Sequence, residues 1–206
     1  MKKKGILVVV SGFSGAGKGT VIKALMEKYD NYALSVSATT RSPRKGEENG
    51  REYFFISEEE FQKKISEHAL IEYAQYVNHY YGTPKDYVTG RMDEGIDVIL
   101  EIEIQGAIKV KEQYPSALLL FLMPPSAEEL KKRLMGRGTE SEEVIDARLR
   151  RASDEAAGME QYDYILINDR VEDCVEEMHR LIQSQHHRMS LNLDMIRQMR
   201  EELKSL

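Results

Sequence analysis

The chain has 206 residues, of which 41% are hydrophobic and 31% are charged, and its formal net charge is −6. That length allows one domain with a large core, and the composition is that of an ordinary soluble globular protein. The charge excludes an overall basic surface for nucleic acid, and no segment reaches the ~20 apolar residues of a membrane span. The single cysteine, Cys174, excludes an internal disulfide framework, so we expect a packing role for it in a cytoplasmic protein.

Short apolar runs recur along the chain, with helical segments between them. Four are strong, at residues 6–10, 97–104, 117–123 and 162–168, and a weaker one lies at 32–38. Continuous apolar runs separated by helices are typical of parallel strands in a sheet that is covered on both faces. The sequence therefore predicts an α/β fold with a parallel five-stranded sheet flanked by helices.

The first apolar run leads into a glycine-rich loop, SGFSGAGKGT at residues 11–20, which is followed by a helical pattern. This order aims backbone N–H groups and the positive end of a helix at an anion, and Lys18 adds a charge for phosphate. The phosphate-loop consensus places a hydroxyl directly after the lysine, whereas here Gly19 follows and Thr20 comes one residue later. We expect Thr20 to lie near a Mg²⁺ ion that is held mostly through water. The loop residues expected to bind ATP are Gly12, Ser14, Gly15, Ala16, Gly17, Lys18, Gly19 and Thr20.

Residues 34–85 are polar and tyrosine-rich, which fits an insertion over the carboxyl edge of the sheet, where open α/β folds bind ligands. Their hydroxyl and guanidinium groups are suited to clasping a monophosphate: Ser37, Arg41, Arg44 and Tyr53. Further along, the Glu72 carboxylate can accept two hydrogen bonds from guanine, and the Thr83 hydroxyl can donate to its O6. Adenine has neither the paired N–H donors nor the O6 acceptor, so a buried Glu72 would disfavour adenine.

Residues 125–157 form a second, arginine-rich insertion. Arg133 and Arg137 are four residues apart, and Arg148 lies on the next helical segment. Arginines on a closing lid stabilise the charge that develops on a transferring phosphoryl group. The alternative is a solvated helix face with salt bridges.

Two absent motifs narrow the class of phosphate-loop protein. The chain has no N-K-x-D, which GTPase switches need, and no H-R-D-x-x-x-x-N loop with a catalytic base. A phosphate acceptor is already an anionic nucleophile at neutral pH, so such an enzyme mainly has to position and neutralise two anions. The arginines therefore favour a phosphate acceptor.

Taken in order, these motifs resemble guanylate kinases, the P-loop nucleoside monophosphate kinases that act on GMP. The resemblance covers about residues 5–185. It implies a P-loop core at residues 1–33, 86–124 and 158–206, a GMP-binding insertion at 34–85 and a lid at 125–157. It also implies transfer of the γ-phosphoryl group of Mg-ATP to GMP, and to dGMP as well, giving ADP and GDP in purine metabolism.

The resemblance implies roles for single residues. The catalytic group would comprise Lys18, Arg44, Arg137 and Arg148. Outside the loop, ATP would contact Arg133, Asn168 and Asp169. GMP would contact Ser37, Arg41, Arg44, Tyr53, Glu72, Tyr81, Thr83 and Glu103. Thr20 and Glu101 would lie near the metal.

The chain departs from the family pattern at two places. Phe13 occupies a loop position where the family usually has proline, and Glu101 and Glu103 stand where many relatives carry at least one aspartate. Side chains alternate along a strand, so these two glutamates share a face. One of them would face the metal waters and the other the guanine edge or an arginine, and the alternative is a purely structural role for one of the two.

Two other functions stay open at this point. Scaffold proteins contain non-catalytic modules that resemble guanylate kinases, and a related enzyme could use another monophosphate as acceptor. The presence of Lys18, Arg41, Arg44 and Glu72 favours an enzyme for GMP.

Residues 186–206 are expected to form one more amphipathic helix, which either docks on the core or mediates self-association. The histidines have no metal-ligand spacing, so we expect solvated or packing roles for them.

Overall fold

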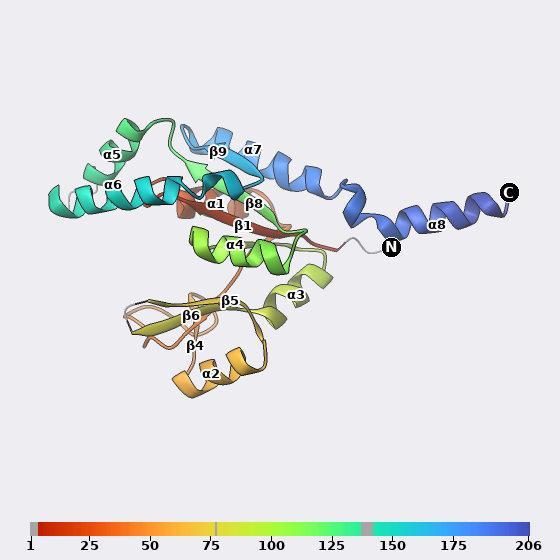
Figure 1. Cartoon of the computed structure of the whole chain (residues 1–206), viewed down its shortest axis with the longest axis horizontal. Coiled ribbons are helices and arrows are strands. Elements are labelled where there is room, and N and C mark those ends of the chain that lie inside the picture. The colour runs from red at the N-terminus through yellow and green to blue at the C-terminus, as the bar shows by residue number, and fades with distance from the viewer. Residues whose placement is uncertain (1–3, 77, 137–141) are drawn as a thin grey trace.

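The computed structural model describes residues 4–76, 78–136 and 142–206. A parallel five-stranded sheet forms its centre, with the strand order β2-β7-β1-β8-β9 (Figure 1). Its strands are β1 Leu7–Gly12, β2 Tyr32–Leu34, β7 Asp97–Glu101, β8 Leu118–Met123 and β9 Tyr164–Ile167. The α/β fold with five parallel strands, expected from the apolar runs, is confirmed.

Helices cover both faces of this sheet because the strand side chains are apolar on both sides. On one face, α1 (Lys18–Lys28) and α7 (Val171–Gln185) pack on a cluster that includes Val8, Val10 and Leu120. On the other face, α3 (Lys85–Asp93) and α4 (Ile104–Gln113) pack on Val9, Leu100 and their neighbours. Both faces of the sheet are therefore packed, and its carboxyl edge stays available for a site.

A second, four-stranded sheet has the order β4-β3-β6-β5 and carries helix α2 (Glu58–Ser66). Its strands are β3 Ser37–Thr39, β4 Tyr53–Phe55, β5 Leu70–Tyr76 and β6 His79–Pro84. The run at 32–38, expected as one strand, is divided between the two sheets. The Ser35 N–H still donates to the Ile99 carbonyl of the first sheet at 2.8 Å, and the next residues pair in the second.

Helices α5 (Ala127–Met135) and α6 (Glu142–Ala156) pack on each other through Leu130, Leu134 and Ile145. The hydroxyl of Ser126 accepts a hydrogen bond from the Glu129 N–H at 3.1 Å and so caps the start of α5. A 3-10 turn, η1 (Met159–Gln161), then leads to β9.

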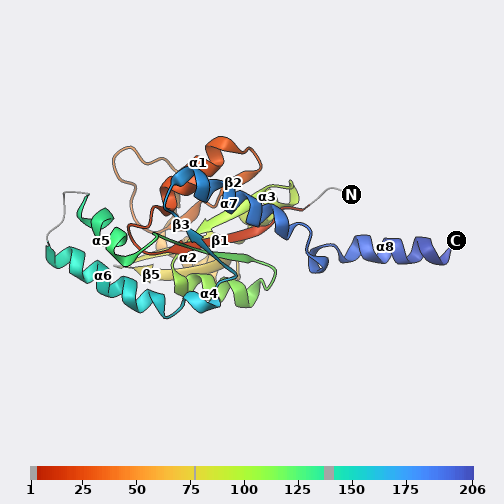
Figure 2. The same ribbon diagram turned by 90° about the horizontal axis from the view of Figure 1, so that it is seen from above.

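The expectation of a single helix over residues 186–206 is wrong. Helix α7 continues to Gln185, a 3-10 turn follows (η2, Met189–Leu191), and a separate helix α8 covers Leu193–Lys204. The break arises because the Asn192 side-chain amide donates to the carbonyls of His186 and Arg188, both at 2.8 Å. From this turn α8 extends away from the rest of the molecule, as both views show (Figures 1 and 2).

No helix within the described ranges combines the length and the apolar character needed to cross a membrane.

Candidate active site at the carboxyl edge of the sheet

The glycine-rich loop joins β1 to α1 and requires glycine for two different reasons. A Cβ at Gly12 would lie 2.0 Å from the Leu122 carbonyl oxygen, because the loop passes close to β8. Gly17 has a φ of +92°, and a Cβ there would lie 2.6 Å from Asn168 Nδ2. At Gly19 the one atom of the described residues within 4 Å of an added Cβ would be Glu101 Oε2, at 4.0 Å. The structure therefore has room at this position for the serine or threonine of the consensus.

Lys18 lies over the loop that precedes it. Its Nζ donates to the carbonyl oxygens of Gly12 at 2.7 Å and Phe13 at 3.3 Å. Burial lowers the pKa of Lys18, and the nearby carboxylates of Glu101, Glu155 and Glu103 oppose that decrease. The ammonium group is thus positioned at the loop, among carboxylates, and is partly shielded from water.

The loop is held from behind by β8 and β9. The buried Asn168, which follows β9, donates from Nδ2 to the Ala16 carbonyl at 2.8 Å. Phe13 packs edge-on against Phe121 of β8, with ring centroids 5.1 Å apart. This aromatic contact fixes the loop at Phe13. Asp169, the next residue, is exposed.

Glu101 and Glu103 face different partners. Glu101 ends β7 beside the first turn of α1, and burial raises its pKa while Lys18 lowers it. Glu103 directly precedes α4, and its Oε1 accepts a hydrogen bond from Arg151 Nη2 at 2.5 Å. Of the alternatives that the sequence left open, Glu101 faces the phosphate loop and Glu103 contacts an arginine.

Arginines of α5 and α6 approach the loop to different degrees. Arg148 Nη1 lies 3.3 Å from the Ser14 hydroxyl, which it contacts as a donor. Arg133 pairs within its own helix, where Nε donates to Glu129 Oε1 at 2.9 Å. Arg137, expected to be catalytic, lies outside the described residues.

The second sheet gathers aromatic and basic side chains around Arg41. Its guanidinium lies 5.3 Å from the ring centroid of Tyr53, and the Tyr53 and Tyr81 rings are 5.9 Å apart, edge to face. Ser37 pairs in register with Tyr53 across β3 and β4, and Arg44 lies on the exposed loop between those strands. The structure thus groups four of the predicted monophosphate residues on this sheet: Ser37, Arg41, Tyr53 and Tyr81.

Glu72 and Thr83 meet on the neighbouring strands β5 and β6. The fully buried Thr83 donates from its hydroxyl to Glu72 Oε1 at 2.7 Å. Burial raises the pKa of Glu72, and the Thr83 hydrogen bond and Lys109 oppose the rise. Gly106 of α4 leaves room here, since a Cβ on it would lie 3.5 Å from Glu72 Oε2. The arrangement places a carboxylate beside a hydroxyl that donates to it, with the second carboxylate oxygen toward Gly106.

Comparison with known proteins assigns the chain to a family. The model of the family "Guanylate kinase" matches residues 4–185. The chain belongs to the guanylate kinase family.

Relatives match over nearly the whole chain. The guanylate kinase of Caldanaerobacter subterraneus subsp. tengcongensis is 50% identical over 202 residues, which are 98% of each chain. That of Lactococcus lactis subsp. lactis is 46% identical over 204 residues, 99% of this chain and 100% of the relative. Among solved structures, guanylate kinase from Anaplasma phagocytophilum matches with a TM-score of 0.71 and 32% identity, covering 91% of this chain and 89% of that one. The family's reaction is ATP-dependent phosphorylation of GMP.

The oxygen donors at the loop fit the magnesium ion that usually accompanies ATP in this family. Thr20 is exposed on the first turn of α1, and Glu101 lies beside the same turn. In the part of the chain that the structure describes, no group of three or more His, Cys, Asp or Glu could hold a metal by itself. An ion held by few protein oxygens, nucleotide phosphates and water agrees with the coordination that Mg²⁺ prefers.

Two contact residues were missed in the sequence. Arg151, next to the predicted arginines, also donates from Nε to Glu155 Oε1 at 2.9 Å, so it bridges α6 to Glu103. Glu47 binds Arg41 through both carboxylate oxygens, at 2.9 and 3.0 Å, and accepts the Arg44 N–H at 2.7 Å. The hydrogen bonds from Arg41 and Arg44 lower the pKa of Glu47. In the sequence, only the position of Glu47 close to two arginines, three residues after Arg44, indicated this role.

We expect Glu47→Gln to raise the KM for GMP by about tenfold and to leave kcat within about twofold. A bidentate carboxylate fixes the plane of a guanidinium, and an amide loses both the charge and one acceptor. Steady-state kinetics at saturating ATP measure this. The exposed neighbour Glu48, which pairs with Arg51, supplies the matched control Glu48→Gln. If kcat falls while KM stays unchanged, Glu47 does not act by positioning Arg41 for binding.

Proposed function

We propose that the residues at this edge transfer the γ-phosphoryl group of ATP directly to GMP, in line and without a covalent intermediate, giving ADP and GDP. The observation that carries this proposal is the segment 101–106, which touches both candidate substrate sites. At one end Glu101 lies beside the phosphate loop, and at the other Gly106 lies against Glu72. ATP bound at the loop and GMP bound at Glu72 would therefore be separated by the length of this short segment.

On the donor side, the loop N–H groups and Lys18 would bind the ATP phosphates. The loop glycines, with Ser14, Ala16 and Thr20, would surround them, and Lys18 would exchange the carbonyls of Gly12 and Phe13 for phosphate oxygens. Asn168 and Asp169 would lie at the base, and Arg133 on α5 would contact the same nucleotide. Asn168 keeps the loop in shape through its bond to Ala16.

On the acceptor side, the monophosphate would bind to Ser37, Arg41, Arg44, Tyr53 and Tyr81. Glu72 would accept the paired donors of guanine, Thr83 would support it, and Glu103 would contact the guanine edge once released from Arg151. Because the acceptor is an anion, the arginines would replace a general base. A buried carboxylate at Glu72 would leave AMP with unpaired groups.

Arg44, Arg137 and Arg148 would stabilise the charge on the transferring phosphoryl group. Arg148, which reaches Ser14, supports a lid that closes on the loop. Before GMP binds, the contact between Arg151 and Glu103 would hold α6 against the N-terminus of α4. This assigns the lid to residues 125–157 and the GMP-binding part to 34–85, with the rest as core.

Magnesium would be held by water between Thr20, Glu101 and the phosphates. When bound, it neutralises phosphate charge. The single buried cysteine fits the reducing cytoplasm as the place of this reaction.

The test is a coupled assay of ADP formation with Mg-ATP and, in turn, GMP, dGMP, AMP and UMP. We expect GMP and dGMP to be phosphorylated, and AMP and UMP to have a kcat/KM lower by at least about 10³-fold. Turnover of AMP or UMP at a similar rate would refute the role of Glu72 in acceptor choice. Folded protein that binds GMP but turns over no acceptor would be a binding module.

A further inference from the structure

Segment 101–106 contacts helix α6 as well as the two candidate substrate sites. Arg151 of α6 donates from Nη2 to Glu103 Oε1 at 2.5 Å. Just after α6, Gly158 packs so closely on the first residue of α4 that an added Cβ would lie 2.8 Å from Ile104 Cγ2. Figure 1 shows α4 between α6 and the second sheet. A change at Glu103 can therefore act on α6 as well as on the acceptor site.

Arg151 is oriented for this contact by its own helix. Its Nε donates to Glu155 Oε1 at 2.9 Å, one turn further along α6, and the Glu155 side chain is only 20% exposed. A guanidinium is planar, so a partner that fixes one edge also sets the direction of the other donors. Glu155 thus keeps Nη2 of Arg151 directed at Glu103.

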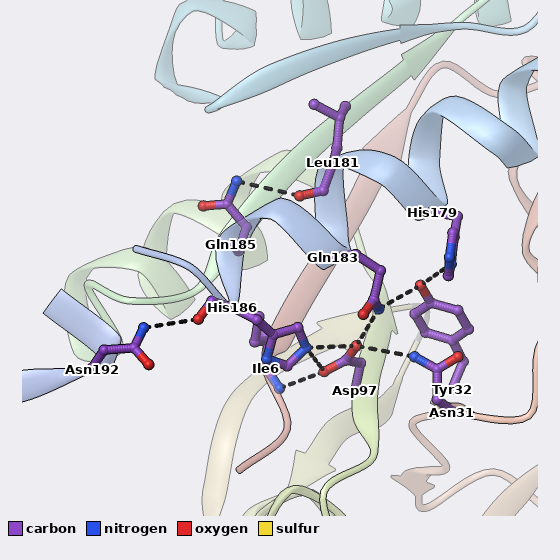
Figure 3. A network of polar contacts seen from close by, with 10 residues as sticks. All are labelled: Ile6, Asn31, Tyr32, Asp97, His179, Leu181, Gln183, Gln185, His186 and Asn192. Atoms are coloured by element: carbon purple, nitrogen blue, oxygen red, sulfur yellow. Dashed lines mark hydrogen bonds and ion pairs between the residues drawn. The ribbon is translucent and has the colours of Figure 1, made fainter. Parts of the chain in front are cut away.

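A second carboxylate, at the amino edge of the first sheet, provides a contrast (Figure 3). Asp97, the first residue of β7, is 1% exposed. It accepts hydrogen bonds from the Ile6 N–H at 2.9 Å and from Gln183 Nε2 at 3.1 Å, and His186 Nε2 lies 2.9 Å from Oδ1. Opening such a contact would leave buried polar groups unpaired, which is costly. Asp97 therefore holds β1, β7 and α7 together permanently.

The Glu103–Arg151 pair has the opposite properties. The side chains of Glu103 and Arg151 are 71% and 48% exposed. Exposed ion pairs contribute little to stability because water solvates both ions, so this pair opens at a small cost in free energy. Glu103 can therefore exchange Arg151 for another donor.

The position of Glu103 indicates which donor that is. Glu103 and Gly106 are three residues apart at the start of α4, so they are neighbours on one face of the helix. Gly106 also lies against Glu72, since an added Cβ would be 3.5 Å from Glu72 Oε2. When Glu72 accepts N1–H and one N–H of the guanine 2-amino group, the other N–H of that group still needs an acceptor. Glu103 is placed to be that acceptor.

We propose that Arg151 is a positioning residue that competes with the guanine 2-amino group for Glu103. This rests on the proposed function, in which Glu72 and Glu103 contact the base. Without GMP, Arg151 occupies Glu103 and ties α6 to α4. The 2-amino group of GMP takes the place of Nη2, so α6 loses this contact when the base binds. A base without a 2-amino group leaves the pair closed.

Isothermal titration calorimetry of the full chain, without ATP, tests the proposal. We expect Arg151→Gln to tighten the binding of GMP about threefold, because an exposed ion pair no longer has to open. Inosine monophosphate carries the same phosphate but no 2-amino group, so its Kd is expected to change by less than about 1.5-fold. Arg150→Gln is the matched control. It removes the same charge from an exposed neighbouring position of α6 and is expected to leave both affinities unchanged.

A double-mutant cycle tests whether the effect passes through Glu103. Glu103→Ala removes the shared acceptor, so adding Arg151→Gln to it is expected to leave the affinity for GMP unchanged. An equal gain for GMP and inosine monophosphate, or the same gain in the Glu103→Ala chain, would overturn the proposal, because the lost charge or an altered helix would then explain it. A GMP affinity that Arg151→Gln does not raise would overturn it as well.

These affinities are measured without turnover, which separates this proposal from the proposed reaction. A chain that binds GMP but phosphorylates no acceptor would refute the reaction. The comparison of GMP with inosine monophosphate would still decide whether Arg151 competes for Glu103. Circular dichroism of each variant checks the fold.

Discussion

Replacement of Lys18 by alanine is expected to lower kcat/KM for phosphoryl transfer by at least about 10³-fold and to leave the protein folded. Lys18 brings a full positive charge to the loop, among the carboxylates of Glu101, Glu103 and Glu155. Without it, those carboxylates would face the phosphates of ATP without compensation. The coupled ADP assay measures the rate, and circular dichroism measures the fold.

Lys23 provides the matched control for this prediction. It lies on the same helix, is exposed, and pairs only loosely with Glu27, at 3.8 Å. Lys23→Ala removes an identical charge from α1 away from the loop, and we expect kcat/KM to stay within about twofold. If Lys18→Ala kept more than a tenth of the activity, the loop backbone would be sufficient for phosphate, and the proposed role of Lys18 would be wrong.

Glu72→Gln is expected to lower kcat/KM for GMP by about 10²–10³-fold and, at the same time, to raise the melting temperature of the ligand-free protein at neutral pH by a few degrees. The loss arises because the amide turns a donor toward the donors of guanine. The gain arises because the substitution removes a charge from a buried position beside Thr83.

The pH dependence of stability separates these two effects. Burial raises the pKa of Glu72 above 4.5, so the folded protein binds this proton more tightly than the unfolded chain does. The stabilisation from protonation is full below the ordinary pKa and is lost as pH rises through the raised value. The melting temperatures of Glu72→Gln and wild type should therefore differ at pH 7 and converge near about pH 4.

The exposed Glu67, which pairs with Lys63 at 3.8 Å, supplies the control Glu67→Gln. We expect neither its activity nor its melting temperature to change measurably, because exposed ion pairs contribute little. An unchanged preference for GMP over AMP in Glu72→Gln would mean that Glu72 does not read the base.

The sheet and the phosphate loop could be predicted because their signals are continuous in sequence. Apolar runs such as 6–10 and 117–123 indicate buried strands wherever they occur, and the loop pattern needs only its neighbouring strand and helix. The strand ends in the runs 97–104 and 32–38 were less well predicted, because β7 ends at Glu101 and the second run is divided between β2 and β3. Strand ends depend on which neighbour supplies hydrogen bonds, and Ser35 bonds one sheet just before the chain joins the other.

The missed residues have two other causes. Arg151 and Asp97 are ordinary charged residues in sequence, and each acquires its role from a partner that the fold supplies, whereas Glu47 meets Arg41 within one loop whose conformation the sequence does not signal. Asp97 and His186 are 89 residues apart in the sequence, and Arg151 and Glu103 are 48 residues apart. The break before α8 was missed because one side chain, Asn192, captures carbonyls that a continuous helix would have used.

The segment 101–106 gives the two substrates a shared support. It contacts the phosphate loop through Glu101 and the Glu72 carboxylate through Gly106. A nucleotide that displaces this segment changes the free energy of the other site as well. By thermodynamic linkage, whatever factor ATP adds to the affinity for GMP, GMP must add to the affinity for ATP. The order in which the substrates arrive would then alter the route to the ternary complex and leave its free energy unchanged.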